Sequence, residues 1–259
     1  MAQKDKKKLI ASKLLLKPGL KVLDIGSGWG GLAMYLAEKE KIDVTGITLS
    51  EEQCKVSKKR LKRIKRKDHV QFRIQDYREE TNVYDRIVSV GMFEHVGKRN
   101  YKHFFQKMSQ LLAKDGIMLL HTIGRLNSPS PINPFIRKYI FPGADLPSLS
   151  EIMRAIEPLG LFVTDVEILR LHYAETLSKW RARFSKRRDD ALRIYDERFC
   201  RMWELYLSLC ETGFRYHQLV VFQIQISNRF DALPWTRDYL FQMEKKGGVK
   251  QKVKGTHAP

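Results

Sequence analysis

Near the start of the chain, four glycines and one carboxylate lie within eight residues, a pattern that can bring a cofactor against bare backbone. Glycine has no Cβ, so its main chain adopts positive φ angles readily and can be approached closely by a ligand. A single tight turn needs fewer glycines than this, and we therefore interpret the segment as a binding site. Its candidate cofactor contacts are Asp24, Gly26, Ser27, Gly28, Trp29, Gly30 and Gly31.

The spacing of these glycines fits two kinds of cofactor site. Gly26, Gly28 and Gly31 match the G-x-G-x-x-G pattern of dinucleotide sites, which leaves NAD open. The segment Asp24–Gly30 also matches D-x-G-x-G-x-G, a pattern that methyltransferases use for S-adenosylmethionine (SAM). Asp24 favours SAM, because a carboxylate at this turn would repel a pyrophosphate but could accept a hydrogen bond from the amino group of SAM's methionine part.

The elements around this segment predict a doubly wound α/β sheet. Lys21–Ile25 is a short apolar run after Pro18-Gly19 and reads as a buried strand, and Leu32–Lys39 follows the glycines as a helix. Strands and helices go on alternating, which is typical of a mostly parallel sheet. The other predicted strands are Ile42–Thr48, Val70–Ile74, Asp85–Val90, Ile117–Ile123, Leu161–Leu169 and Leu219–Ile226. The other predicted helices are one from the Ser50 cap to about Lys67, Tyr101–Ala113 before a turn at Lys114-Asp115-Gly116, Leu149–Pro158, and a mostly helical stretch from Tyr173 to about Arg215.

The pattern divides the chain into one large domain and a tail. Five prolines between Asn127 and Pro147 are too many for an ordinary connection, so we predict an insertion over the C-terminal edge of the sheet, where ligands bind in such folds. The predicted domain covers residues 1–228, with helical insertions at about 127–158 and 172–215. Residues 229–259 are predicted to be a basic tail, disordered from about Lys245.

The charge of the chain points to an anionic partner. The formal net charge is +19, and basic residues are densest between Lys55 and Lys67. Such a charge suits either nucleic acid or an anionic membrane surface. No run of 18 apolar residues could form a membrane span, and no secretory signal is visible at the N-terminus. The three cysteines have no metal-ligand spacing and suggest a reducing compartment, so we expect no metal site.

Four stretches together resemble the cyclopropane-fatty-acyl-phospholipid synthase family of SAM-dependent methyltransferases, and the similarity runs from about residue 9 to about residue 228. They are Leu23–Gly31, Arg86–Gly97 with Phe93-Glu94-His95-Val96-Gly97, Leu119–Gly124 with Leu-His-Thr-Ile-Gly, and Tyr139–Gly143. The resemblance implies a Rossmann-like, seven-stranded, mostly parallel sheet with an antiparallel last strand and helical insertions over the acyl site.

The resemblance also implies a reaction. In the family, the π bond of a cis-unsaturated phospholipid acyl chain attacks the methyl group of SAM, a carbocation forms, the added carbon loses a proton, and the ring closes. Related enzymes add a plain or hydroxylated methyl group instead. The expected partners are unsaturated phospholipid acyl chains and an anionic membrane surface, with a homodimer left open. The expected location is the cytoplasm, peripherally at the inner face of the membrane.

Four side chains match the family's catalytic positions. Glu94, His121 and Tyr173, with the backbone at Ile123, match the positions that hold a small anion, taken to be bicarbonate. A compact base suits this chemistry, because a carbocation in an apolar pocket must lose one proton and be kept from water. Cys210 matches a cysteine once regarded as the active-site residue. An alkene nucleophile needs no covalent step, so a buried structural cysteine is the preferred interpretation. His95 is as easily structural as functional.

Further cofactor contacts are expected where the second and third strands end. Ser50 is predicted to cap the helix that follows, in a capping box with Gln53. Asp76 could accept from the adenine amino group and Tyr77 could stack on its ring, while a turn cap explains Asp76 equally well. The candidates after the second strand, near the ribose and methionine parts of SAM, are Thr48, Leu49, Ser50 and Gln53.

Two departures from the family pattern leave other functions open. Ser27 stands where members usually have cysteine, and no counterpart of the family's N-terminal helical region, with its Tyr-Ser-Cys-type motif over SAM, precedes the first strand. A non-catalytic or partner-requiring fragment is therefore one alternative. An RNA methyltransferase is another that the charge permits. It is disfavoured because Met92-Phe93-Glu94-His95 occupies the position where base methyltransferases carry Asn/Asp-Pro-Pro-Tyr or a catalytic cysteine, so no nucleic-acid partner is expected.

Overall fold

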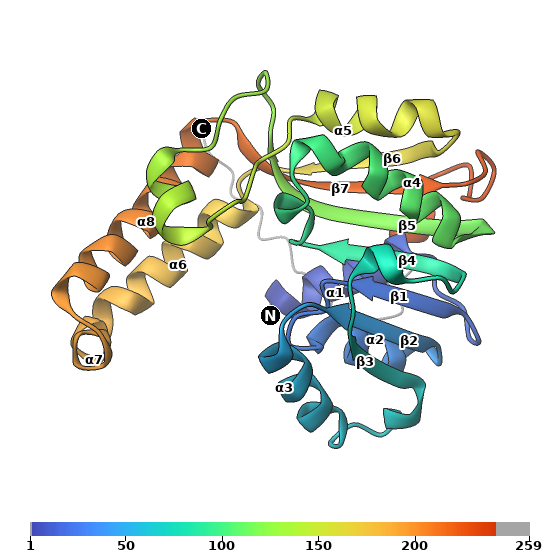
Figure 1. Ribbon diagram of the computed structural model, residues 1–259, viewed down its shortest axis with the longest axis horizontal. Coiled ribbons are helices and arrows are strands. Elements are labelled where there is room, and N and C mark those ends of the chain that lie inside the picture. Colours follow the sequence, from blue (N-terminus) through green and yellow to red (C-terminus); the bar gives the residue numbers. More distant parts are fainter. Residues whose placement is uncertain (1, 242–259) are drawn as a thin grey trace, which may run out of the picture.

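A seven-stranded sheet forms the centre of the molecule in the computed structural model, which describes residues 2–241 (Figure 1). The strand order is β3-β2-β1-β4-β5-β7-β6. Six strands run in the same direction, and only β7 is antiparallel, between β5 and β6. The predicted Rossmann-like architecture and the antiparallel last strand are confirmed. The strands are β1 Lys21–Ile25, β2 Asp43–Thr48, β3 Val70–Ile74, β4 Tyr84–Val90, β5 Leu112–Arg125, β6 Phe162–Leu169 and β7 Leu219–Ser227.

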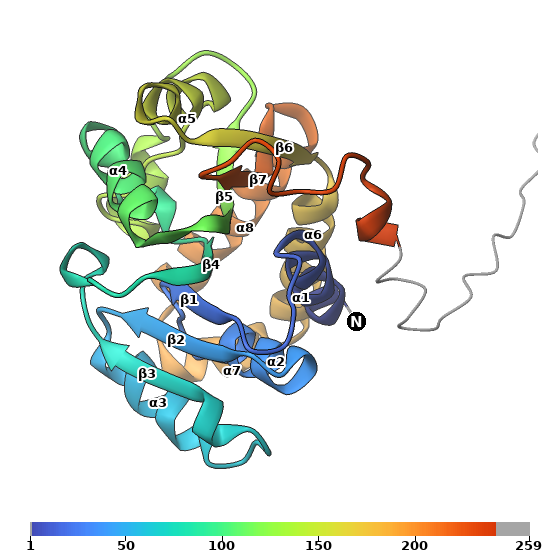
Figure 2. The ribbon, with the colours of Figure 1, turned by 90° about the vertical axis from the view of Figure 1, so that its right-hand side faces the viewer.

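Helices cover both faces of this sheet (Figure 2). On one face α1 Ala2–Lys13, α2 Gly31–Glu40 and α3 Glu51–Leu61 enclose an apolar cluster with β1, β2 and β3. On the other face α4 Tyr101–Leu111 and α5 Leu149–Ile156 pack on a second cluster that includes four phenylalanines. The strand order reverses between β1 and β4, and this switch point is where α/β sheets bind their ligands.

A helical unit extends beyond the sheet and encloses a third apolar cluster (Figure 1). It consists of α6 His172–Lys186, α7 Arg188–Ile194 and α8 Glu197–Tyr216, together with the π-helix η5 Ile136–Ile140 from the proline-rich insertion. The remaining short helices are η1 Lys67–His69, η2 Tyr77–Glu79, η3 Phe93–His95, η4 Lys98–Asn100 and η6 Glu157–Leu159.

Several predicted boundaries were wrong. The helix predicted to reach Lys67 ends at Leu61, because the run of like charges that follows disfavours a continued helix. The predicted turn at Lys114-Asp115-Gly116 is part of β5, which starts at Leu112 and reaches β4 through a register shift. The stretch from Tyr173 to Arg215 is three helices, and α1 was not predicted at all.

The part of the predicted tail that the structure describes packs against the sheet. Arg229 bonds to Asp115 at 2.8 Å, and Arg237 pairs with Asp165 of β6 at 2.8 Å. Tyr239 donates to Gln225 of β7 at 2.9 Å. The predicted disorder from Lys245 concerns residues outside the described range. Among residues 2–241, every helix is too short or too polar to cross a lipid bilayer.

Candidate active site

The glycine turn after β1 leaves one backbone position open. Gly26, Gly28 and Gly30 all have positive φ, at 75°, 54° and 73°. A Cβ on Gly26 would lie 2.8 Å from Met92, and one on Gly30 would lie 2.5 Å from Phe72, so both glycines are required by packing. A Cβ on Gly28 would meet nothing closer than 4.0 Å. The main chain at Gly28 is therefore accessible to a ligand, beside the N-terminus of α2.

Asp24 is a buried carboxylate with a free oxygen at this turn. Its side chain is 2% exposed, and Oδ2 has no hydrogen-bond partner among the described residues. Burial raises its pKa to about 7, against the opposing effects of the Ala33 N–H and the nearby Lys6 ammonium. A buried acceptor without a donor fits a ligand that brings its own cationic amino group, as SAM does.

The raised pKa of Asp24 predicts pH-dependent binding of SAM. Only the ionised carboxylate can accept from an ammonium group, so a protonated Asp24 must first release its proton. Affinity should therefore fall about tenfold per pH unit below about pH 7 and be flat just above it. Calorimetry between pH 5.5 and 8.5 measures this dependence. Asp24→Asn should bind more weakly and without that pH dependence, and an unchanged slope in this variant would contradict the assignment.

Two neighbours of these glycines differ in exposure. Ser27 is buried, and its Oγ lacks a hydrogen-bond partner among the described residues, which again leaves a polar atom for a ligand. Trp29 is 52% exposed, and its carbonyl accepts from Arg60 of α3 at 2.8 Å. The indole is therefore free to cover a bound molecule, while its backbone is held in place.

The polar residues after β2 form a local network. Thr48 donates to Gln53 Oε1 at 2.9 Å, and the Ser50 N–H donates back to Thr48 Oγ1 at 3.2 Å. Ser50 caps α3 by accepting from the Gln53 N–H, as predicted. The second hydrogen bond of the predicted capping box is absent, because the Gln53 side chain accepts from the Thr48 hydroxyl and not from the Ser50 backbone N–H. Leu49 is 72% exposed beside them and offers an apolar contact.

The two residues proposed for adenine have structural partners. Asp76 accepts from the Arg78 N–H at 2.9 Å and from its guanidinium at 2.6 Å, so it caps η2. The structure thus agrees with the alternative interpretation of Asp76 as a turn cap. Tyr77 packs edge-on against Phe104 with ring centroids 5.3 Å apart, and it contacts the cluster under α4. Its ring is only partly available for stacking.

Glu94 is a second buried carboxylate with one free oxygen. It lies in η3, just after β4, and is 6% exposed. Oε1 accepts from the Ile123 N–H at 2.6 Å, while Oε2 has no partner in the described part of the chain. Burial raises its pKa, which the Ile123 N–H opposes. The backbone at Ile123 was expected to help hold an anion, and its N–H donates to Glu94 in the structure.

The His121 ring contacts the side chain of Gln223. The Gln223 amide of β7 lies 3.0 Å from His121 Nδ1 on the adjacent strand. Burial lowers the pKa of His121 to about 3, with Lys6 and Lys13 contributing, so the ring is neutral. When the amide nitrogen donates to Nδ1, the imidazole proton lies on Nε2 and the ring becomes a fixed donor. His121 lies two residues before Ile123 on β5, so the two side chains share one face of this strand.

Tyr173 and Cys210 are the remaining two candidate catalytic side chains. Both contact the cluster of α6 and α8, which also includes Ile123. Burial raises the pKa of Tyr173, and the neighbouring Cys210 and Glu94 add to it, so the phenol keeps its proton. Burial raises the pKa of Cys210 to about 11. The thiol is therefore protonated near neutral pH, which opposes a nucleophilic role and agrees with a structural one.

Two residues near the site were missed by the sequence analysis. The sequence signal for Gln223 was a polar residue within the apolar run of β7, and the structure shows this residue to be fully buried. Lys6 gave no signal, because it is one of several lysines in a segment not predicted to be helical. The charge of its ammonium lowers the pKa of both Asp24 and His121. Within residues 2–241, no cluster of three or more His, Cys, Asp or Glu side chains is arranged to hold a metal ion.

Comparison with known proteins identifies relatives for most of the chain. The family model described as "Mycolic acid cyclopropane synthetase" matches residues 1–224. The chain is 42% identical over 226 residues to cyclopropane-fatty-acyl-phospholipid synthase of Escherichia coli K12, covering 87% of this chain and 58% of that protein. It is 37% identical over 227 residues to the SAM-dependent methyltransferase UmaA of Mycobacterium tuberculosis, covering 83% of this chain and 79% of UmaA.

Solved structures agree with these relatives. The cyclopropane synthase MmaA2 of Mycobacterium tuberculosis superposes with a TM-score of 0.82 at 30% identity, covering 87% of this chain and 84% of that one. Mycolic acid cyclopropane synthase CmaA1, solved with SAH and CTAB, superposes with a TM-score of 0.81 at 33% identity, with the same coverage. The chain spans less than two thirds of the length of its Escherichia coli relative. The matched range, the identities and the shared architecture show that this chain belongs to the mycolic acid cyclopropane synthetase family.

Proposed function

We propose that the chain transfers the methyl group of SAM to the cis double bond of an unsaturated acyl chain in a membrane phospholipid and forms a cyclopropane ring. The observation that carries this proposal is that Glu94, buried with one free oxygen, bonds to the backbone of Ile123, a residue packed in an apolar cluster with Tyr173 and Cys210. The neutral His121 lies two residues before Ile123 on the same strand. Such surroundings suit a reaction that passes through a carbocation and must exclude water.

The cofactor residues support SAM at the turn after β1. When bound there, SAM supplies an electrophilic methyl group. Asp24 would accept from its amino group, Gly28 would allow close approach of the main chain, and Thr48 and Gln53 would border the ribose and methionine parts. Asp76 and Tyr77 would lie beside the adenine, with their partners Arg78 and Phe104 limiting how far they can move.

We further propose that Glu94, His121 and Tyr173 hold a bicarbonate ion, which would supply a compact base. The polar groups fit it: Glu94 Oε2 is a free acceptor for the ion's hydroxyl, and the neutral His121 ring and the protonated Tyr173 are donors. The role of Ile123 would be to hold Glu94 through its N–H. Cys210 would border the acyl chain as an apolar contact.

Methyl transfer tests the proposal directly. Vesicles of dioleoylphosphatidylglycerol are incubated with the protein and labelled SAM, and the lipids are examined by mass spectrometry and proton NMR. A gain of one CH₂ per acyl chain with the high-field signals of a cyclopropane is expected. A plain methyl or methylene product would correct the outcome of the reaction, and labelling of RNA in place of lipid would refute the substrate class. SAM binding without any transfer would favour a subunit that needs a partner chain.

The exposed basic residues of α3 and the following turn support a location at the cytoplasmic face of the membrane. Lys55, Lys58 and Lys59 are exposed on α3, and Lys62 and Arg63 continue this surface. We therefore expect the protein to adsorb to anionic vesicles, with about 1 kcal/mol for each basic residue near the surface at low salt. A homodimer stays a prediction that sedimentation can check.

Vesicle sedimentation measures this adsorption. Binding should weaken as salt rises past the range where the Debye length falls below about 10 Å. Lys58→Glu with Lys59→Glu should weaken it further, whereas the matched pair Lys17→Glu with Lys114→Glu, far from α3 in the sequence and exposed, should change it less. Equal binding of the protein to neutral and anionic vesicles would show that charge is not the cause.

A further inference from the structure

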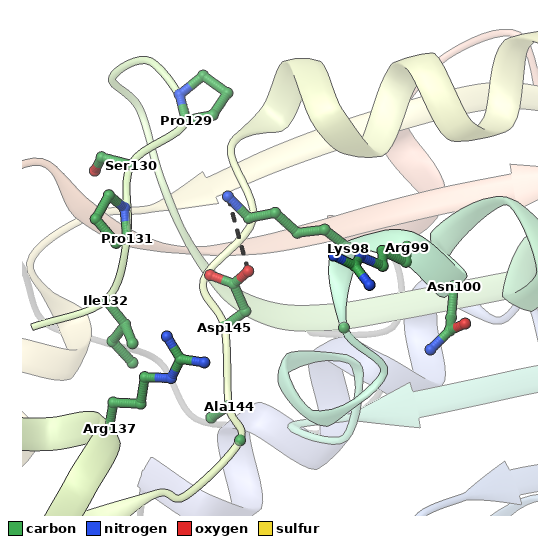
Figure 3. Close-up of a pocket in the computed structure, with 12 residues that line it drawn as sticks. Lys98, Arg99, Asn100, Pro129, Ser130, Pro131, Ile132, Arg137, Ala144 and Asp145 are labelled. Carbon is green, nitrogen blue, oxygen red and sulfur yellow. Dashed lines mark ion pairs between the residues drawn. The ribbon is translucent and has the colours of Figure 1, made fainter. Parts of the chain in front are cut away.

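A cavity of about 660 Å³ lies beside the candidate active site and has no role in the reaction as proposed. It is formed by η4, the start of the proline-rich insertion and the segment after η5 (Figure 3). Its walls carry three basic side chains, Lys98, Arg99 and Arg137, and one carboxylate, Asp145. The lining therefore has a net positive charge.

The basic side chains of this cavity differ in how they are paired. Lys98 extends toward Asp145 at 3.7 Å (Figure 3). It also pairs with Glu151 at 3.0 Å, so its charge is already compensated. Arg99 and Arg137 are exposed, and neither has a carboxylate partner within 4 Å in the part of the chain that the structure describes. Two guanidinium groups on opposite walls are thus left to bind an anion from outside.

The cavity shares a wall with the apolar cluster of the site. Ile132 lines the cavity and is also a member of the cluster that includes Tyr173 and Cys210. The segment Gly97–Asn100 comes shortly after Glu94, and the Asp145 N–H donates to the Glu94 carbonyl at 2.8 Å. A molecule bound in the cavity could therefore place an anionic group near Arg99 and Arg137 and an apolar chain against this cluster.

We propose that this cavity binds the phosphodiester of the phospholipid headgroup, through Arg99 and Arg137, while the acyl chain lies in the neighbouring cluster. Guanidinium groups bind phosphate oxygens in paired hydrogen bonds, which gives both affinity and orientation. This inference rests on the proposed function, since it assigns the headgroup end of the same substrate. The same chemistry would bind free phosphate, and the test separates the two sources.

Lipid binding in micelles of a neutral detergent tests the proposal independently of turnover. The two lipids are dioleoylphosphatidylglycerol and dioleoylglycerol, which has the same acyl chains and no phosphate. Arg99→Glu with Arg137→Glu should weaken binding of the phospholipid by about tenfold or more and leave dioleoylglycerol within about twofold. Arg99→Lys with Arg137→Lys keeps the charge without the paired geometry and should lie between.

The matched control is Lys17→Glu with Lys114→Glu, which makes the same change in net charge at exposed positions outside the cavity. It should bind both lipids as the unaltered protein does. Equal weakening in this control, or equal weakening for both lipids, would overturn the proposal. If the double variant misfolds, the single variants Arg137→Gln and Arg99→Gln replace it, with unchanged SAM binding as the check that each is folded. Unchanged phospholipid binding in both single variants would also overturn the proposal.

Competition separates the two phosphate sources. Glycerophosphoglycerol should displace the phospholipid at lower concentration than inorganic phosphate does, because it presents the same diester. The reverse order would assign the cavity to free phosphate and refute headgroup binding. If lipid binding follows the expected pattern while no methyl transfer occurs, the cavity assignment stands and the proposed reaction fails.

Discussion

Glu94→Gln should lower turnover on unsaturated phospholipid by about 10²–10⁴, the usual worth of a positioned acid–base group. Glutamine keeps the shape of the side chain but replaces the buried Oε2 acceptor by an amide, so the loss would reflect positioning of the anion and not packing. SAM affinity should be nearly unchanged, because Asp24 and the glycine turn, which we assign to SAM, contain neither Glu94 nor its partner Ile123. Turnover and calorimetry on the same preparation measure both quantities.

His121→Ala is the companion variant, with the same expected loss of turnover and the same retention of SAM affinity. Added bicarbonate should partly restore either variant if its defect is weak anion binding, because occupancy follows concentration. The control is Cys210→Ser, a substitution of a protonated thiol, for which we expect a much smaller loss. Near-normal turnover of both Glu94→Gln and His121→Ala would remove these side chains from the mechanism.

The second large effect is expected at the glycine turn. Gly28→Val should lower SAM affinity by about a hundredfold or more. A steric overlap that costs about 3 kcal/mol of binding free energy raises the Kd by two factors of ten. The protein itself leaves the space beside Gly28 open, so the clash would be with the ligand. The φ of 54° also makes valine locally strained.

Gly160→Val separates the two contributions. Gly160 has a φ of 69° and nothing within 4 Å of a Cβ, so it has a similar strain without adjoining the cofactor turn. It should lower the melting temperature by a similar amount as Gly28→Val and leave SAM affinity unchanged. Comparable loss of affinity in both variants, or calorimetry that detects NAD binding and no SAM binding, would refute the assignment of the turn.

The strands were the most predictable part of the fold. Buried parallel strands are short apolar runs bounded by turn residues, and all seven were found from that pattern. The residue at which a helix or strand begins or ends depends on tertiary contacts, and a local sequence pattern does not reveal those contacts. The start of β5 at Leu112, for example, depends on pairing with Tyr84 across a register shift. The helix α1 was missed because its hydrophilic first half hides the few apolar residues that it buries, such as Ile10.

The candidate site was predictable in its residue types and less so in its hydrogen bonds. The motifs gave Asp24, Glu94 and His121, and the structure shows the first two to be buried with a free oxygen each. Which donor each acceptor chooses depends on distances across the fold. Ile123 therefore turned out to hold Glu94, and Gln53 turned out to hold Thr48. Gln223 lies 102 residues from His121, beyond the reach of any local pattern.

The burial of His121 makes the two candidate sites respond differently to acidity. A ring whose pKa is about 3 keeps the same charge across the whole range of cellular pH, so the side chain that we propose for catalysis does not change when a cell is acidified. The carboxylate at the cofactor turn does change over that range. During acid stress, then, capture of the methyl donor would limit lipid modification, and a larger intracellular supply of that donor would offset the loss.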